Sequence, residues 1–306
     1  MASLELPAGL VGTTMGPSLQ EVDARWLMAY AAALGETGAG YFDTRRPAGV
    51  HAHPLFPVCY EWPVAVAMRA ALPEDISVRS VHATHDLRIH RPPRAGDRLS
   101  VRATVTRVEP RRAGAYVLSR YETADAAGEP VTTTEYGSVY LGVGCPGPDA
   151  GAAAGTSREE AAAPSRATPA GDVPAPAWSA SVPVAAGLAH VYTECARIWN
   201  PIHTDAAVAA RAGLPEIILH GTATLALAIS RVLAQEGREP GAVTRVTGRF
   251  GAMVAMPSAL TVRGHAPEDT AEGHRVRFDA LAPGGGPAIR DGALWLARTA
   301  RGSTHT

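Results

Sequence analysis

The sequence predicts an α+β protein built from two similar halves, in each of which an antiparallel sheet wraps around one central helix. Three observations lead to this prediction. A long stretch rich in Ala, Gly, Pro and Ser divides the chain. Six residues recur at a constant offset of 161 positions, among them Arg88 with Arg249 and Leu99 with Leu260. In both halves an apolar helical pattern precedes a series of strand patterns.

The dividing stretch covers residues 143–182 and has no apolar periodicity, as expected of a flexible linker. It separates an N-terminal domain at residues 1–142 from a C-terminal domain at residues 183–306. With 306 residues, of which 46% are hydrophobic, the chain is long and apolar enough to give each domain a core.

One long helix is expected in each half. "WPVAVAMRAAL" covers residues 62–72, and "TATLALAISRVL" covers residues 222–233, where Leu225, Ile229 and Val232 share one helix face. Strand patterns follow at 81–91, 97–110, 115–125 and 131–143 in the first half, and at 242–250, 258–266, 274–282 and 292–300 in the second.

Composition excludes several classes of function. The 28 basic residues are all arginine and nearly cancel the 29 acidic ones, so the formal charge of -1 gives no electrostatic case for nucleic acid. The N-terminus lacks a signal-peptide pattern, and the longest apolar run, 217–230, is too short for a membrane helix, so we expect a cytoplasmic protein with no membrane partner. Three scattered cysteines suit neither a disulfide framework nor a zinc site, and we expect no metal and no cofactor.

The candidate chemistry lies in residues 197–223, "RIWNPIHTDAAVAARAGLPEIILHGTA". Asn200-Pro201 predicts the start of a short helix that ends near Gly213, with the Asn200 side chain as its cap. His203 then lies close to the helix N-terminus, where the positive end of the dipole favours a neutral imidazole. A neutral histidine suits the role of a general base.

A second helix start follows at His220-Gly221-Thr222. Because glycine has no side chain, a ligand can approach the backbone of Gly221, and its N–H at the start of a helix can stabilise an oxyanion. The spacing alone favours a structural role, in which Gly221 forms a tight turn and His220 packs against it.

Two motifs in this region resemble a known family. "NPIHTD", followed by "AGLPEIILHG", resembles the signature of the MaoC-like, or R-specific enoyl thioester hydratase, family of hot-dog proteins. In the first half, "HRPPRAGDRLSVRATVTRV" and the strand pair after it resemble the N-terminal hot-dog of such proteins. The resemblance implies a double hot-dog, two tandem hot-dog domains with a single active site at their junction.

The resemblance also implies roles for individual residues. His203 would be the catalytic base or acid, Asn200 would orient it or the bound water, and the Gly221 N–H would hold the thioester carbonyl oxygen. The first half would form the shell around the acyl chain. At the 161-residue offset, the first half has Ala39 in place of Asn200, Phe42 in place of His203 and Tyr60 in place of Gly221. These three first-half residues cannot supply the same chemistry.

One position departs from the family pattern. Aligning "YTECARIWNPIHTD" without gaps puts Tyr192 on the family's tyrosine and Ile198 on its catalytic aspartate. An isoleucine can neither hold the reacting water nor donate a proton. Glu194, one helical turn earlier, and Tyr192 are candidate substitute acids, whereas Asp205 is a weaker one because it suits support of the helix.

The substrate side of the site is less defined. Candidate pocket residues are Ile198, His220, Tyr60, Trp62 and Phe56, although aromatic residues beside an apolar helix also suit a core. Arginines at 45–46 and within 88–94 either contact the phosphates of CoA or a carrier-protein arm or form a charged surface.

We therefore expect a MaoC-like dehydratase or hydratase acting on a 3-hydroxyacyl or 2-enoyl thioester of CoA or carrier protein. Ile198 leaves two alternatives open: a hot-dog isomerase or cyclase of a biosynthetic pathway, and a non-catalytic acyl-thioester binding protein. A double hot-dog already pairs its two halves, so the protein is expected to be a monomer or a homodimer.

Overall fold

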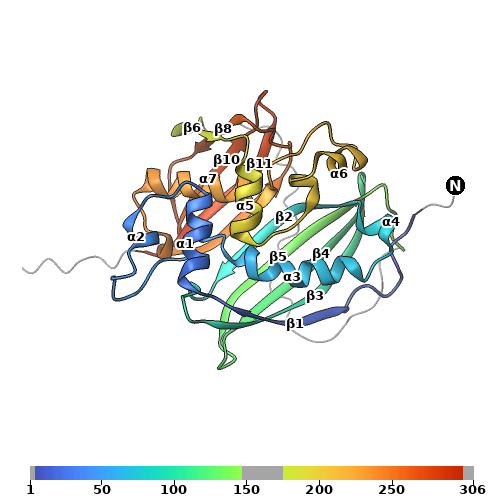
Figure 1. The fold of residues 1–306 in the computed structure, drawn as a ribbon, viewed down its shortest axis with the longest axis horizontal. Helices are drawn as coiled ribbons and strands as arrows, with labels where there is room; N and C mark the ends of the chain where they lie inside the picture. The colour runs from blue at the N-terminus through green and yellow to red at the C-terminus, as the bar shows by residue number, and fades with distance from the viewer. Residues whose placement is uncertain (1–3, 147–174, 299–306) are drawn as a thin grey trace, which may run out of the picture.

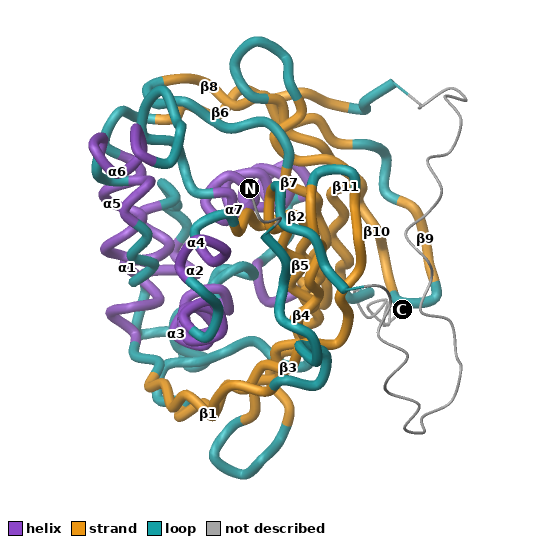
Figure 2. The backbone as a smooth tube through the Cα atoms, turned by 90° about the vertical axis from the view of Figure 1, so that its right-hand side faces the viewer, coloured by secondary structure: helices purple, strands orange, loops and turns teal. Residues whose placement is uncertain are grey.

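The computed structural model describes residues 4–146 and 175–298, and in it the helices lie on one side of a single curved sheet (Figures 1 and 2). The first half contains β1 (Thr14–Glu21), α1 (Ala24–Ala33), α2 (Ala39–Phe42), α3 (Pro57–Ala70), α4 (Glu74–Ser77), β2 (Ser80–Ile89), β3 (Arg98–Arg111), β4 (Gly114–Ala124) and β5 (Pro130–Leu141). The second half contains β6 (Trp178–Val184), α5 (Leu188–Ala196), the 3-10 helix η1 (Pro201–His203), α6 (Ala206–Arg211), α7 (Gly221–Glu236), the 3-10 helix η2 (Pro240–Ala242), β7 (Val243–Phe250), β8 (Ser258–Gly264), β9 (Glu268–Thr270), β10 (Gly273–Leu281) and β11 (Pro287–Leu296).

The order of the strands shows that the two halves are copies related by an approximate twofold axis. Across the sheet the order is β1-β3-β4-β5-β2-β7-β11-β10-β8-β6, with β9 pairing β10 at one side. Counted outward from the central pair, the strands of the first half are β2, β5, β4, β3 and β1. Their counterparts in the second half, in the same order, are β7, β11, β10, β8 and β6. The halves join where β2 pairs antiparallel with β7, with His85 opposite Gly248. The duplication predicted from the 161-residue offset is thus present in the order of the strands, with β9 as an addition in the second half.

Each half buries one long helix against the sheet. In α7, Leu225 and Ile229 are fully buried, and they belong to the same core as Val246 of β7 and Val262 of β8. Full burial of a side chain of this size stabilises a fold by about 1.5–3 kcal/mol. The helical spacing in "TATLALAISRVL" therefore marked the core face of α7 correctly.

The eight predicted strands all occur, but several elements were not predicted, among them the strands β1 and β6 and the helices α1 and α5. β1 and β6 form the two edges of the sheet and contain Pro17 and Pro183. Proline is tolerated at an edge because no neighbour needs its N–H, yet it interrupts the strand pattern in the sequence.

The division into domains stays a prediction. β6 begins at Trp178, inside the range 143–182 that the sequence assigns to the linker, so at least its last residues are strand. Most of that range, 147–174, lies outside the described residues.

Candidate functional site

His203 ends the 3-10 helix η1 and faces the start of α7. Its ring is 9% exposed, and Nδ1 lies 2.8 Å from the carbonyl oxygen of Ile218. Because a carbonyl only accepts hydrogen bonds, Nδ1 carries the proton, and Nε2 keeps its lone pair. Burial lowers the pKa of His203 to about 4, although the bond to Ile218 opposes the shift. At neutral pH this histidine is therefore an uncharged base.

His220 stacks directly on His203. The ring centroids are 3.8 Å apart with an interplanar angle of 26°, and His220 Nε2 lies 3.1 Å from the Thr193 hydroxyl. Burial, and after it the neighbouring His203, lower the pKa of His220 to about 2. A stacked pair of neutral rings holds His203 in one orientation.

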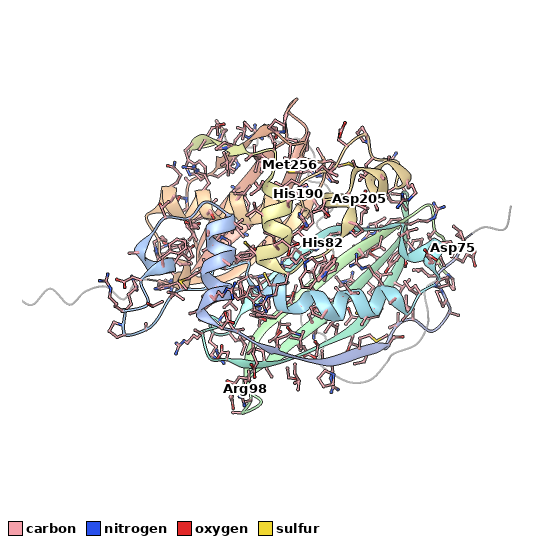
Figure 3. All side chains as sticks on the ribbon, in the orientation of Figure 1. Asp75, His82, Arg98, His190, Asp205 and Met256 are labelled. Atoms are coloured by element: carbon pink, nitrogen blue, oxygen red, sulfur yellow. The ribbon has the colours of Figure 1, made fainter. Side chains whose placement is uncertain are left out.

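The helix that the sequence predicts from Asn200 to Gly213 is two short helices. Asn200 precedes η1, but its side chain makes no capping hydrogen bond; Asp205 instead caps α6 by accepting from the N–H groups of Ala207 and Val208. Asp205, labelled in Figure 3, thus supports a helix as expected. The sequence predicted a neutral His203 because of a helix dipole. However, η1 spans only Pro201–His203, and burial is the main cause of the lowered pKa of His203.

Gly221 is the first residue of α7, with His220 at the N-cap position. A side-chain carbon added at Gly221 would stand 3.0 Å from Cδ1 and 3.2 Å from Cε1 of Phe250. Glycine at this position therefore lets the start of this 16-residue helix pack closely against Phe250.

Six of the predicted site residues come together around one cavity. It lies between α3, the start of α7 and the β5-β2-β7 part of the sheet, and the same hollow extends to more exposed charged residues, among them the ion pair Arg120–Glu135. Its lining includes Ile198, Asn200, His203, His220, Gly221 and Trp62. Its described lining does not include Tyr192, Glu194, Tyr60 or Phe56.

The two candidate substitute acids point elsewhere. Tyr192 is fully buried, and its hydroxyl donates to Thr222 Oγ1 at 3.1 Å and lies 3.4 Å from the Tyr30 hydroxyl. Burial raises the pKa of Tyr192, so it holds its proton tightly. Glu194 is exposed on the outer side of α5. Neither position supports a role as a proton donor in the cavity.

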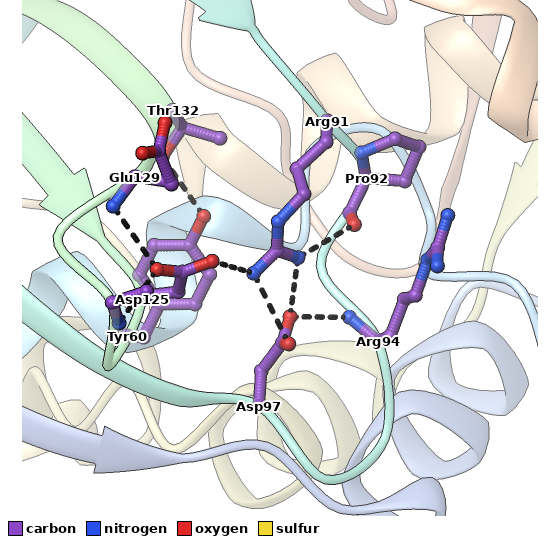
Figure 4. A network of polar contacts seen from close by, with 9 residues as sticks. Tyr60, Arg91, Pro92, Arg94, Asp97, Asp125, Glu129 and Thr132 are labelled. Atoms are coloured by element: carbon purple, nitrogen blue, oxygen red, sulfur yellow. Dashed lines mark hydrogen bonds and ion pairs between the residues drawn. The ribbon is translucent and has the colours of Figure 1, made fainter.

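Tyr60 and Phe56 belong to the core of the first half. The Tyr60 hydroxyl lies 2.9 Å from Thr132 Oγ1, as Figure 4 shows, and the Phe56 ring is in edge contact with Tyr60 at 6.0 Å between centroids. Figure 4 also shows Arg91 held between Asp97 and Asp125, at 2.8 and 3.0 Å. This arginine of the 88–94 segment is occupied by internal ion pairs.

Sequence analysis missed a polar group in the first half that lines the same cavity: His82, His85, Tyr136 and Glu61. His82 and His85 are three residues apart, and strand alternation would place them on opposite faces. The register of β2 against β5 shifts between His82 and Thr84, which makes a β-bulge and turns both rings to the inner face, 5.4 Å apart. Glu61 was placed just before the predicted helix, but α3 begins at Pro57 and buries it.

Within residues 4–146 and 175–298, no group of three or more His, Cys, Asp or Glu side chains is arranged to hold a metal ion. None of the helices in this part of the chain is both long and apolar enough to cross a bilayer.

Comparison with known families agrees with this geometry. Residues 176–277, which include His203 and Gly221, match the model of the MaoC-like domain. The chain carries a MaoC-like domain. Residues 9–134 match a second model, the FAS1-like dehydratase domain region. No curated protein sequence matches the chain.

Solved structures show the same architecture. A MaoC-like dehydratase from Phytophthora capsici is 19% identical, with a TM-score of 0.73 over 95% of this chain and 97% of that one. The full-length peroxisomal multifunctional enzyme type 2 of Drosophila melanogaster is 21% identical, with a TM-score of 0.71 over 92% of this chain but 48% of that one. A Mycobacterium tuberculosis protein described as a double hot-dog is 18% identical, with a TM-score of 0.57 over 93% and 95% of the two chains. The chain therefore has the double hot-dog fold.

Proposed function

We propose that this MaoC-like protein is a dehydratase or hydratase that interconverts a 3-hydroxyacyl and a 2-enoyl thioester, carried on CoA or on a carrier protein. The observation that carries the proposal is the position of His203, a neutral base beside Gly221 in the domain that matches the MaoC-like family. Asn200 lines the cavity next to His203 and is assigned to orient the substrate hydroxyl or a water.

In dehydration, Nε2 of His203 removes the proton from C2 of the thioester. The charge that develops on the carbonyl oxygen is stabilised by the Gly221 N–H, which is free of an intrahelical partner because Gly221 begins α7. A helix N-terminus adds a favourable dipole at that point.

The absence of an acid at Ile198 is compatible with elimination through a single group. After taking the C2 proton, His203 is an imidazolium whose N–H can protonate the leaving hydroxyl. The C3–O bond then breaks, the C2=C3 bond forms and water departs, so that His203 returns to its neutral state. Ile198, 4% exposed, would exclude other water from this side of the cavity.

A second candidate is an isomerase or cyclase, and Ile198 is the observation that favours it. Moving a proton between C2 and C4 also needs one base and one oxyanion donor, and no water has to be held. Non-catalytic binding of an acyl thioester is a third candidate, which predicts that a change of His203 leaves the biological role intact.

Incubation with a series of 3-hydroxyacyl and 2-enoyl thioesters, on CoA and on carrier protein, tests the proposal. Interconversion of a hydroxyacyl and an enoyl species supports the dehydratase. Double-bond migration or ring closure alone supports the second candidate. No reaction with any member of the series would exclude the first proposal.

A further inference from the structure

The cavity that holds His203 has an unusual lining where it enters the first half of the chain. The wall beyond Phe250 consists of two histidines, a tyrosine and a glutamate: His82, His85, Tyr136 and Glu61. Phe250 touches Gly221 on one side, and its ring lies 4.3 Å from that of His82 on the other. These four side chains, here called the inner polar group, therefore follow the thioester site along the cavity.

The inner polar group is held in place by packing. His82, which lies at the centre of the molecule (Figure 3), stacks on Tyr136 with centroids 3.8 Å apart and an interplanar angle of 12°. His82 Nε2 lies 3.1 Å from the Thr84 carbonyl oxygen, so this nitrogen carries the proton and Nδ1 is an acceptor. Glu61 accepts a 2.6 Å hydrogen bond from the Thr134 hydroxyl.

His85 leaves hydrogen-bonding capacity unused. It is 2% exposed, and among the described residues neither of its ring nitrogens has a hydrogen-bond partner. An unsatisfied buried polar atom of this kind is destabilising, so its presence in a cavity wall calls for a partner. The β-bulge that brings His82 and His85 to one face is a type of irregularity concentrated next to functional sites.

The protonation states make the group neutral and rich in donors. Burial raises the pKa of Glu61 to about 8, so near neutral pH its carboxyl group keeps a proton. Burial lowers the pKa of His85 to about 4 and holds that of His82 well below its ordinary value. Arg69, whose guanidinium lies 4.5 Å over the Trp62 ring, lines the same cavity and adds further N–H donors.

We propose that the inner polar group is a subsite for an oxygen atom on the acyl chain, so that the substrate carries a hydroxyl or keto group beyond the carbons that react. A plain hydrocarbon chain would leave both ring nitrogens of His85 unpaired and would offer no acceptor to the Tyr136 hydroxyl or to the proton of the Glu61 carboxyl group. An oxygen on the chain can accept from these donors and, as a hydroxyl, can also donate to His82. The subsite rests on the proposed function for the identity of the ligand as an acyl thioester.

The cavity continues past the subsite. A smaller hollow shares Ala65, Arg69, Tyr121 and Tyr136 with the main cavity and is closed by Met15, Met68, Leu72 and Val105. The chain beyond the oxygen is thus assigned to an apolar end. This arrangement selects against a fatty acyl chain of the same length by leaving buried polar groups unpaired.

Binding of matched ligands tests the proposal without relying on turnover. The probes are non-hydrolysable acyl-CoA thioethers in pairs of equal length, one saturated and plain, the other with a hydroxyl or keto group placed in turn on each carbon beyond C3. Dissociation constants are measured by calorimetry for the wild-type protein and for Tyr136→Phe, which removes one hydroxyl and keeps the ring stacked on His82. Tyr41→Phe is the matched control, because Tyr41 lies on α2 against His53.

We expect the wild-type protein to bind at least one oxygenated ligand about tenfold or more tightly than its plain partner. Tyr136→Phe should reduce this ratio several-fold without weakening binding of the plain ligand, and Tyr41→Phe should preserve it. His82→Phe is the second variant, should Tyr136→Phe be unstable. A ratio near one in the wild-type protein, an unchanged ratio in both variants, or no binding of either series would overturn the subsite. Selective binding with no turnover would instead count against the proposed reaction alone.

Discussion

The rings of His203 and His220 stack at 3.8 Å between centroids, and each ring has one nitrogen anchored to a different element. His203 bonds to the Ile218 carbonyl oxygen just before α7, and His220 bonds to the Thr193 hydroxyl of α5. The pair therefore joins the η1 segment, α5 and the start of α7 around the candidate site. Both histidines are uncharged near neutral pH, because burial lowers the pKa of each.

The first prediction concerns pH and activity. Since the pKa of His203 is lowered to about 4, the base form is present at neutral pH and is lost only as the pH falls through about 4. We expect kcat/KM to be level between about pH 5.5 and pH 7 and to fall about tenfold per pH unit well below 4. A profile with its midpoint near 6.5, the ordinary value for histidine, would contradict the assignment. Circular dichroism at each pH separates loss of activity from unfolding.

The second prediction concerns Gly221. Gly221→Ala places a methyl group 3.0 Å from Phe250, so either the ring or the start of α7 must move. We expect the free energy of unfolding to fall by about 1–3 kcal/mol and kcat to fall as the N–H leaves its position. Gly187→Ala is the control, because no atom lies within 4 Å of the added carbon there. Denaturant unfolding should show Phe250→Leu recovering stability in the Gly221→Ala background; equal effects of the two glycine changes would argue against close packing.

The third prediction concerns Glu61 and stability. The folded protein holds the Glu61 proton up to a pKa of about 8, whereas the ordinary value is 4.5. Between these values the folded state binds more protons than the unfolded state, so the free energy of unfolding falls as the pH rises through this window. Glu61→Gln keeps an acceptor for Thr134 and does not titrate.

Urea unfolding of the wild-type and Glu61→Gln proteins at about pH 5 and about pH 8 measures this contribution. We expect the variant to lose less stability over this interval than the wild-type protein. Glu194→Gln, at an exposed position, should behave as the wild-type protein. The same loss in the wild-type and Glu61→Gln proteins would show that Glu61 does not carry a raised pKa.

The fourth prediction separates the two catalytic candidates. Ile198→Asp puts a carboxyl group at the position that the motif aligns with the family's aspartate. If the native reaction is dehydration, the added acid should raise the rate of interconversion, at a cost in stability because Ile198 is 4% exposed. Under the isomerase or cyclase candidate the native rate should not rise. Product analysis by mass spectrometry, with thermal unfolding as the control, distinguishes the two.

Much of the fold followed from local pattern. The spacing of Leu225 and Ile229 marked the buried face of α7, and the 161-residue offset marked the duplication. The edge strands β1 and β6 were missed because Pro17 and Pro183 break the alternation on which strand prediction depends. Alternation of side chains is a local property, whereas a place at the sheet edge is decided by the whole topology.

The candidate site followed the sequence only where a motif was present. His203 and Gly221 were located by "NPIHTD" and "LHG", and the structure brings both to one cavity. The inner polar group could not be found in this way, because a β-bulge places His82 on the same face as His85 and no pattern in "VHATHD" marks the bulge. Glu194 was proposed from helical spacing and Tyr192 from its nearby place in the motif, and neither observation shows what the side chain contacts.

Exchange of the C2 hydrogen tests the central claim most directly, because hydration, elimination and isomerisation all include a proton transfer at that carbon. In deuterated water, with 3-hydroxyacyl and 2-enoyl thioesters followed by mass spectrometry, the wild-type protein should incorporate deuterium at C2. His203→Asn, whose amide can still donate to the Ile218 carbonyl oxygen, should lower this rate by about 10²–10⁴-fold, whereas the exposed His190→Ala should not change it. Equal exchange in the wild-type and His203→Asn proteins, or none in the wild-type protein with any thioester, would contradict the account.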